Sequence, residues 1–199
     1  PANIMRLLEI VKAEKTSPAI LATVLKLAKT IKKVGAVAGV CHGFIGNRML
    51  TGYGREAHLL VLEGARPEQV DQVLYQFGMP MGVIAMADMA GLDIGTRLRQ
   101  QMDESEYDVM STVVADRLVE QGRCGQKTGA GFYDYQAGNR TPIPSKITQA
   151  IINETAEKFT IKQRTIDEDE IINRCFYAMC NMGFDILDEG MAFRSSDID

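Results

Sequence analysis

The hydrophobic pattern of this 199-residue chain changes at Gly43, and the change limits the folds open to it. Before Gly43, apolar runs over 4–11 and 34–40 flank an amphipathic stretch that starts at Ser17-Pro18. Because Ser is a preferred N-cap and Pro favours the first helical position, a helix is predicted from residue 18 to 31. After Gly43 the strand signal nearly vanishes. The sequence therefore predicts a mainly α fold preceded by one strand–helix–strand unit.

Helical periodicity predicts a series of helices after Gly43. Gly64 ends the first long pattern, and Pro67 starts the next. The predicted ranges are 49–62, 67–77, 83–90, 92–98, 109–118, 147–159 and 171–191. The glycine-rich, basic stretch 122–133 lacks the spacing of a P-loop, and no apolar strand leads into it. We interpret it as a structural loop that ends in an aromatic plug.

Composition argues against several classes of function. The formal net charge of −4 argues against nucleic acid as the main partner. No apolar run is long enough to span a membrane, and no signal peptide is visible. The four cysteines and two histidines lack the paired spacing of metal ligands, so no metal site is predicted. Reduced cysteines fit a cytosolic or peroxisomal compartment.

The chain also contains an internal repeat. Asn47-Arg48 begins one long helical pattern, which ends at Glu63-Gly64. Asn173-Arg174 begins another, which ends at Glu189-Gly190 with the same spacing. An apolar residue followed by Asp comes soon after each copy, so we interpret the two stretches as a duplication whose second copy is cut short.

Two polar residues stand in otherwise apolar surroundings. Asn47 lies near a helix start, where an amide either satisfies free backbone N–H groups or faces a cleft and binds a substrate carbonyl. Glu9 lies between Leu8 and Ile10 in the first predicted strand. Local spacing alone favours the helix-start role for Asn47 and a solvent-facing position for Glu9.

Several separated motifs occur in a fixed order along the chain. They are Gly43-Phe44-Ile45-Gly46-Asn47-Arg48, Gly78-Met79-Pro80-Met81-Gly82, Asp88 with Gly91-Leu92-Asp93, and Lys127-Thr128-Gly129 with Gly131-Phe132-Tyr133. Together they resemble the 3-hydroxyacyl-CoA dehydrogenase family, above all the multifunctional fatty acid β-oxidation enzymes that also carry an enoyl-CoA hydratase domain. The resemblance implies the end of a Rossmann-type NAD-binding domain at 1–41, a first helical C-terminal domain at 42–135 and a second, partial helical repeat at 136–199.

The resemblance implies NAD-dependent oxidation of 3-hydroxyacyl-CoA to 3-oxoacyl-CoA. In the family a histidine takes the proton of the substrate hydroxyl, a glutamate orients that histidine, and an asparagine contacts the substrate. The residues that match here are Glu9 and Asn47. The matching histidine falls upstream of Pro1, and neither His42 nor His58 matches it. Because no G-x-G-x-x-G fingerprint occurs, NAD is expected to be bound by a domain outside this chain.

The resemblance further implies an acyl-CoA partner and a cytoplasmic (bacterial) or peroxisomal location. It also implies a homodimer or another association through helical faces. In relatives with a single repeat two helical domains pair as a dimer, so a second repeat is an alternative to the partner subunit. The two ends, Pro1 and Asp199, indicate a piece of a longer protein that is inactive alone.

Other interpretations stay open at this point. One is a non-catalytic helical module for dimerisation or docking. Another is the helical domain of a different NAD-dependent β-hydroxyacid dehydrogenase, against which the Gly-Met-Pro-Met-Gly and Gly-Leu-Asp motifs argue. A group of methionines is interpreted as ordinary core ahead of an adaptable acyl groove. They are Met49, Met79, Met81, Met86 and Met89.

Overall fold

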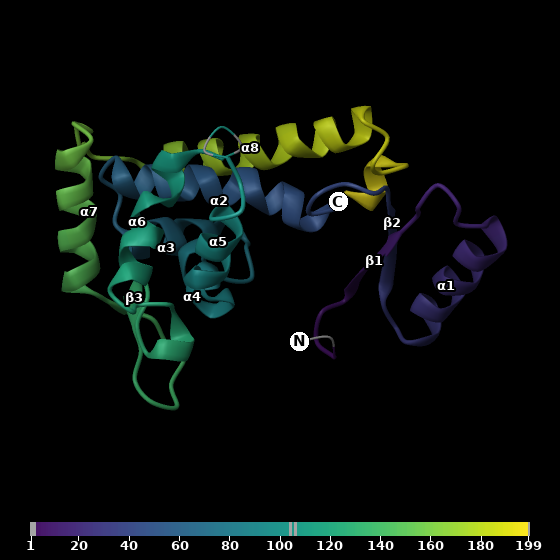
Figure 1. The fold of residues 1–199 in the computed structure, drawn as a ribbon, viewed down its shortest axis with the longest axis horizontal. Helices are drawn as coiled ribbons and strands as arrows, with labels where there is room; N and C mark the ends of the chain where they lie inside the picture. The colour runs from purple at the N-terminus through teal and green to yellow at the C-terminus, as the bar shows by residue number, and fades with distance from the viewer. Residues whose placement is uncertain (1–2, 104, 106, 199) are drawn as a thin grey trace. The chain divides into compact units, whose positions relative to one another are not determined.

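A computed structural model of the protein describes residues 3–103, 105 and 107–198 (Figure 1). The chain forms two units. One contains the residues up to Gly52 together with those from Tyr177 onward, and the other is Tyr53–Phe176. Helices α2 (Gly46–Leu62) and α8 (Glu168–Asp188) contribute residues to both units. The described part of the chain is mainly helical with a few short strands, so the predicted fold class is confirmed.

The first unit opens with the predicted strand–helix–strand order. Strand β1 (Leu7–Val11) pairs in parallel with β2 (Val34–Ala38), and helix α1 (Pro18–Thr30) connects them. The Ser17 hydroxyl accepts a hydrogen bond from the backbone N–H of Ile20 at 3.3 Å, which confirms the predicted helix start. The run predicted from residue 4 becomes a strand only at Leu7, because β2 begins opposite that residue.

The core of the first unit is small and aliphatic. Ile45, just before α2, and Ile186, near the end of α8, are almost fully buried. They belong to one cluster with Ala36 and Ala38 of β2 and with Ala192. Burial of these side chains stabilises the contact of strand β2 with the start of α2 and the end of α8.

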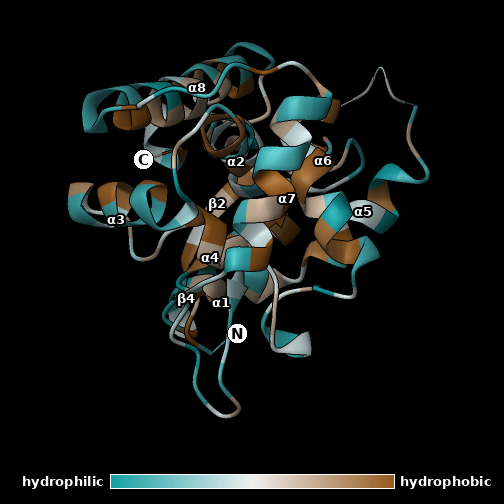
Figure 2. Ribbon diagram, turned by 90° about the vertical axis from the view of Figure 1, so that its left-hand side faces the viewer, coloured by the Kyte–Doolittle hydropathy of each residue, from teal (hydrophilic) through white to brown (hydrophobic). Residues whose placement is uncertain are grey.

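The second unit consists mostly of helices. They are α3 (Pro67–Phe77), α4 (Val83–Ala90), α5 (Leu92–Arg99), α6 (Val109–Glu120) and α7 (Lys146–Lys158), together with parts of α2 and α8. Pro67 is the first residue of α3, as predicted, and the Asp108 carboxylate caps α6. Hydrophobic and hydrophilic residues alternate around α3, α5 and α8 (Figure 2), as expected for helices that bury one face.

As predicted, the glycine-rich stretch 122–133 is a structural loop. It contains a short helix that was not predicted, η2 (Gln126–Thr128). Phe132 and Tyr133 at its end are buried, so the predicted aromatic plug is confirmed. Asp88 of α4, fully buried, accepts hydrogen bonds from the backbone N–H groups of Phe132 and Tyr133 at 2.8 and 2.9 Å. A Cβ atom on Gly131 would lie only 2.0 Å from Asp88 Oδ1, so this approach requires glycine.

Two features of the second half differ from the prediction. Helix α8 begins at Glu168 rather than at residue 171, and the Asp167 carboxylate caps this start by accepting from Glu170 N at 2.7 Å. It ends at Asp188 rather than at 191, because the chain turns at Gly190 with a φ of 69°. A short antiparallel pair of strands, β3 (Tyr133–Asp134) and β4 (Ile143–Pro144), was not predicted, because two-residue strands have no periodicity.

No helix in the part of the chain that the structure describes is long and apolar enough to cross a membrane. Within the same residues, no three or more His, Cys, Asp or Glu side chains are grouped so that they would hold a metal ion. The four cysteines are free thiols. Asp199, which closes the second copy of the repeat, lies outside the described residues, as does Pro1.

Candidate active site

Strand β1 places Glu9 against the start of helix α2. Glu9 lies opposite Ala36 in the parallel pair and is half-buried. Its Oε1 accepts hydrogen bonds from the backbone N–H groups of Ile45 and Gly46, each at 2.9 Å. The first N–H groups of a helix lack partners within the helix and carry partial positive charge, so a carboxylate is a favourable acceptor. Glu9 therefore caps α2, and the expectation of a solvent-facing side chain is wrong.

The two carboxylate oxygens of Glu9 differ in their surroundings. Oε1 accepts both hydrogen bonds from the start of α2. Oε2 accepts none from the residues that the structure describes. An ionised carboxylate has about four acceptor positions, so Oε2 keeps its capacity to bind an added N–H donor. Glu9 thus combines one oxygen fixed by the fold with one oxygen open to a further partner.

A tight turn directs the first N–H groups of α2 toward Glu9. Gly43 and Phe44 both have positive φ angles, 72° and 50°. The Gly43 carbonyl accepts a hydrogen bond from Arg48 N at 3.2 Å, and a Cβ atom on Gly43 would lie 3.1 Å from that same nitrogen. Glycine is therefore favoured at residue 43 by conformation and by space, which explains the Gly that opens this motif.

Asn47 is the second residue of α2, and its side chain is exposed. The backbone carbonyl of Asn47 accepts a hydrogen bond from the Thr51 hydroxyl at 3.0 Å. The Asn47 amide group makes no hydrogen bond with the described residues. Because Glu9 already binds the N–H groups of Ile45 and Gly46, the helix start does not use Asn47 as a cap. The interpretation of Asn47 as a helix-start residue therefore has no support in the structure, and its amide is open to a ligand.

The next residue, Arg48, binds the far end of the repeat. Its two terminal nitrogens each lie 2.6 Å from a different oxygen of Glu189, which follows the last residue of α8. This bidentate geometry suits a planar guanidinium and a carboxylate. The Arg48 guanidinium lowers the pKa of the Glu189 carboxyl below its usual value. The first turn of α2 is therefore held by β1 through Glu9 and by the end of α8 through Arg48.

Neither histidine has the surroundings of a catalytic base oriented by a carboxylate. His42 is exposed, in the turn before α2. His58 donates from Nδ1 to the carbonyl of Ser111 at 3.0 Å, and its ring packs edge-to-face with Phe132. Burial lowers the pKa of His58 to about 4, so this imidazole is neutral at pH 7. We interpret His58 as a structural residue of the second unit.

The methionines do not share one pocket. Met49 lines an apolar pocket of about 300 Å³ in the first unit. Seven other residues of α8 and of the segment after it help to form this pocket: Met179, Cys180, Gly183, Phe184, Leu187, Ser195 and Ile198. Met81 lines a different pocket, in the second unit, and Met89 is half exposed. Met49 belongs to the same unit as Glu9 and Asn47, whereas Met79, Met81, Met86 and Met89 belong to the second unit.

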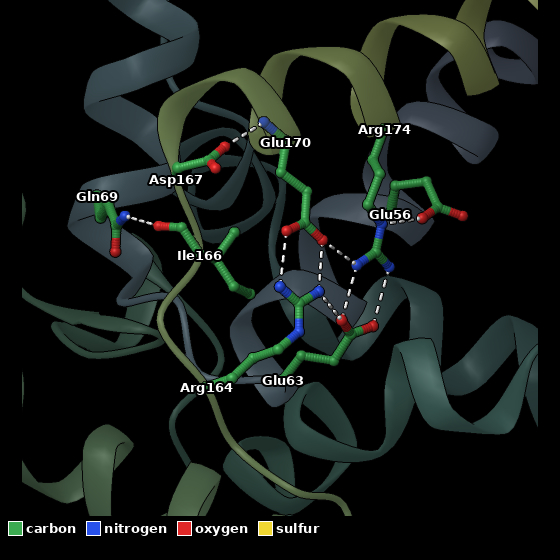
Figure 3. A network of polar contacts seen from close by, with 8 residues as sticks. All are labelled: Glu56, Glu63, Gln69, Arg164, Ile166, Asp167, Glu170 and Arg174. Carbon is green, nitrogen blue, oxygen red and sulfur yellow. Dashed lines mark hydrogen bonds and ion pairs between the residues drawn. The ribbon is translucent and has the colours of Figure 1, made fainter.

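The second unit holds an ion-pair network that corresponds to the Arg48 contact (Figure 3). Arg174 of α8 binds both oxygens of Glu63, at 2.7 and 2.9 Å, and also binds Glu56 at 2.9 Å. Arg164 joins the network through Glu63 and Glu170. The pKa of the Glu170 carboxyl falls to about 2, because Arg164 and Arg174 stabilise its charged form. The network connects the end of α2 to the start of α8.

These ion pairs were not predicted from the sequence, although the repeat contains the signal for them. The Asn-Arg and Glu-Gly motifs recur at equal spacing, and each Arg contacts the Glu of the other copy. The cap by Glu9 was not predicted either. Its partners, Ile45 and Gly46, are distant in sequence, and no local pattern joins them to the strand.

In comparisons with known proteins, two family profiles match this chain. Residues 1–41 match the family profile of the 3-hydroxyacyl-CoA dehydrogenase, NAD binding domain, and residues 43–135 match that of the 3-hydroxyacyl-CoA dehydrogenase, C-terminal domain. The peroxisomal bifunctional enzyme of Cavia porcellus is 41% identical over 100% of this chain and 29% of its own length. The peroxisomal fatty acid beta-oxidation multifunctional protein of Oryza sativa subsp. japonica is 34% identical over 100% of this chain and 28% of its own.

A solved structure agrees in fold. The dehydrogenase part of multifunctional enzyme 1 from C. elegans superposes with a TM-score of 0.77 at 30% identity and covers 100% of this chain and 44% of its own. The chain thus spans less than a third of the two relatives described above and less than half of the solved structure.

Proposed function

This chain belongs to the 3-hydroxyacyl-CoA dehydrogenase family, and from that premise we propose that the whole protein oxidises 3-hydroxyacyl-CoA to 3-oxoacyl-CoA with NAD as the hydride acceptor. In this proposal Glu9 and Asn47 belong to the active site. One observation carries the assignment: Glu9 Oε1 binds the N–H of Gly46, the residue directly before Asn47. Two residues far apart in sequence are thereby held at one place, and each has an unused polar group.

The proposed role of Glu9 follows from its unused oxygen. A carboxylate that accepts the N–H of an imidazole fixes the tautomer of that ring and raises its basicity. Glu9 Oε2 is the atom available for this contact. The oriented histidine takes the proton of the substrate hydroxyl as the hydride leaves C3. We assign this histidine to the whole protein upstream of Pro1, because His42 and His58 do not fit the role.

The proposed role of Asn47 is to bind a substrate oxygen. Its side-chain amide presents two N–H donors and one carbonyl acceptor, none of them paired with a described residue. Donors that already face the oxygen where negative charge develops stabilise the transition state without reorganisation. Asn47 lies in the first turn of α2, where the partial positive charge of the helix start adds to this effect.

The turn between β1 and α1 does not fit the phosphates of NAD. A diphosphate is bound where a glycine-rich turn brings backbone N–H groups close at a helix start. The turn between β1 and α1, residues 12–17, contains no glycine, and the Ser17 hydroxyl is already bound to Ile20 N. We therefore assign the contacts to the nucleotide phosphates to another part of the whole protein and derive no step through NAD here.

We extend the proposal to two features of the whole protein. The names of the relatives include bifunctional and multifunctional enzymes of peroxisomes, which supports a peroxisomal location here, with a bacterial cytoplasm as the alternative. They also support a second activity, which we assign as enoyl-CoA hydratase in a part of the protein outside these residues. Hydration of crotonyl-CoA by the whole protein, retained when Glu9 is replaced, is the expected result.

The dehydrogenase proposal is tested by the Glu9→Gln variant of the whole protein. Reduction of acetoacetyl-CoA is followed through the loss of NADH absorbance. Loss of an orienting carboxylate is expected to lower turnover by about a hundredfold or more. Glu14→Gln is the matched control, because Glu14 is exposed just beyond the same strand. Turnover of Glu9→Gln within about twofold of the wild type would contradict the proposal and favour a non-catalytic association module.

A further inference from the structure

The two copies of the repeat exchange ion pairs. Arg48 of the first copy binds Glu189 of the second, and Arg174 of the second copy binds Glu63 of the first. Both contacts are bidentate, with nitrogen–oxygen distances of 2.6 to 2.9 Å. In each copy the arginine follows directly after an asparagine. The repeat thus produces two equivalent anchors, one in each unit of the structure.

The surroundings of the two asparagines differ although the anchors are equivalent. Helix α2 begins only one residue before Asn47, and Glu9 caps that start. Helix α8 begins at Glu168, so Asn173 lies well inside a helix whose backbone groups are already paired. Only the first copy therefore places an exposed amide in a helix's first turn beside a carboxylate. The anchor at Arg48 holds this turn, whereas the anchor at Arg174 holds a helix interior.

A first helical turn needs such support. The opening N–H groups of a helix have no partners inside it, and helix ends fray. Glu9 fixes the backbone of the first turn at Ile45 and Gly46 and, among the described residues, makes no hydrogen bond with a side chain of that turn. Arg48 is one-fifth exposed and reaches Glu189 with both terminal nitrogens, which limits rotation of the turn about the Glu9 contact. In the sequence, Asn47 lies between Gly46, which is bound by Glu9, and Arg48, which is bound by Glu189.

We propose that Arg48 and Glu189 are positioning residues that hold Asn47 in the orientation required to bind the substrate oxygen. This inference rests on the proposed function. It gives the second copy of the repeat a role in the active site, since Glu189 belongs to that copy. A displacement of a substrate-binding group by about 1 Å can lower the rate by up to a hundredfold. Loss of one of two supports for the turn is expected to have a smaller effect.

The test is a double-mutant cycle in the whole protein, with acetoacetyl-CoA and NADH as substrates. Glu189→Gln is expected to lower kcat about tenfold and to leave the KM for NADH unchanged. In an Asn47→Ala background, the same change is expected to alter kcat by less than about twofold, because Glu189 acts through Asn47. A merely structural role predicts instead that the two effects multiply.

The second anchor supplies a matched control. Glu63→Gln removes the carboxylate that binds Arg174, and it also removes a partner of Arg164. Its effect on thermal stability is expected to be at least as large as that of Glu189→Gln. Its kinetics are expected to stay within about twofold of the wild type, because Arg174 does not follow a substrate-binding residue.

The possible failures can be told apart. If Asn47→Ala lowers kcat but Glu189→Gln does not, or if their effects multiply, the positioning inference is overturned and the proposed function stands. An equal kinetic loss in Glu63→Gln also overturns the inference, because it points to general destabilisation. If Asn47→Ala alone leaves the kinetics unchanged, the proposed role of Asn47 fails and the inference fails with it.

Discussion

Glu9 Oε1 lies 2.9 Å from the backbone nitrogen of Gly46, so a side chain of strand β1 caps helix α2. The same oxygen binds Ile45 N, while Oε2 accepts no hydrogen bond from the described residues. A residue assigned to catalysis by family resemblance is therefore also a structural residue of the fold. The two roles can be separated by substitutions at residue 9 that remove one function and keep the other.

Glutamine and alanine at residue 9 are expected to differ in stability and to agree in activity. Glu9→Gln keeps a carbonyl oxygen for the two N–H groups but loses the charge, whereas Glu9→Ala removes the acceptor. Loss of a helix cap costs about 1 kcal/mol, and an unsatisfied, partly buried N–H adds to this cost. Urea unfolding of the 199-residue chain is expected to show a lower midpoint for alanine than for glutamine. Equal midpoints would contradict the capping role.

Asn47→Ala is expected to impair substrate binding without destabilising the protein. The Asn47 side chain makes no hydrogen bond with the described residues, and alanine favours a helix. In the whole protein, kcat/KM for acetoacetyl-CoA is expected to fall by roughly a hundredfold, whereas the KM for NADH stays close to the wild-type value. Thr51→Ala, one turn further along α2, is the control. A lowered melting temperature with normal kinetics would instead support the helix-start interpretation.

The partly buried imidazole of His58 is expected to make the chain sensitive to acid. Its pKa is about 4 in the folded state and 6.5 when unperturbed, so the unfolded chain binds the proton more readily between these values. Stability is therefore full above pH 6.5 and falls as the pH approaches 4, by about 2–3 kcal/mol. His58→Gln is expected to flatten the dependence of the urea midpoint on pH in this window. His42→Gln, which replaces an exposed imidazole in the first unit, is the matched control.

The sequence predicted the elements that local signals define. Ser17-Pro18 and Pro67 mark the starts of α1 and α3, and both occur as predicted. The start of α8 was missed because its cap, Asp167, precedes the apolar stripe by several residues. The strands β3 and β4 were missed because each has only two residues, which is too few to show the alternating hydrophobic pattern of a strand.

The candidate site shows the same division between local and distant signals. Glu9 and Asn47 were identified through resemblance, and their roles stay predictions. Periodicity alone assigned Glu9 to solvent, because its partners on α2 are brought close only by the fold. The repeat indicated that Arg48 corresponds to Arg174 and that Glu63 corresponds to Glu189. The spacing does not show which of these residues contact one another. Only the structure showed that each arginine binds the other copy.

The strand pair of the first unit is expected to make the 199-residue chain self-associate. Among the described residues, β1 and β2 pair only with each other apart from one isolated bridge at Ala38, and Leu7 and Val34 are half exposed. Unpaired strand edges with apolar side chains promote pairing with a second chain. Sedimentation velocity at low micromolar concentration is expected to show a dimer. Val34→Lys places a charge at this edge and is expected to shift the chain toward monomer, whereas Tyr75→Lys, at an exposed residue of the second unit, is expected to leave the dimer intact. A monomer at every concentration would refute the prediction, and dissociation by Tyr75→Lys alone would place the interface on the helical unit.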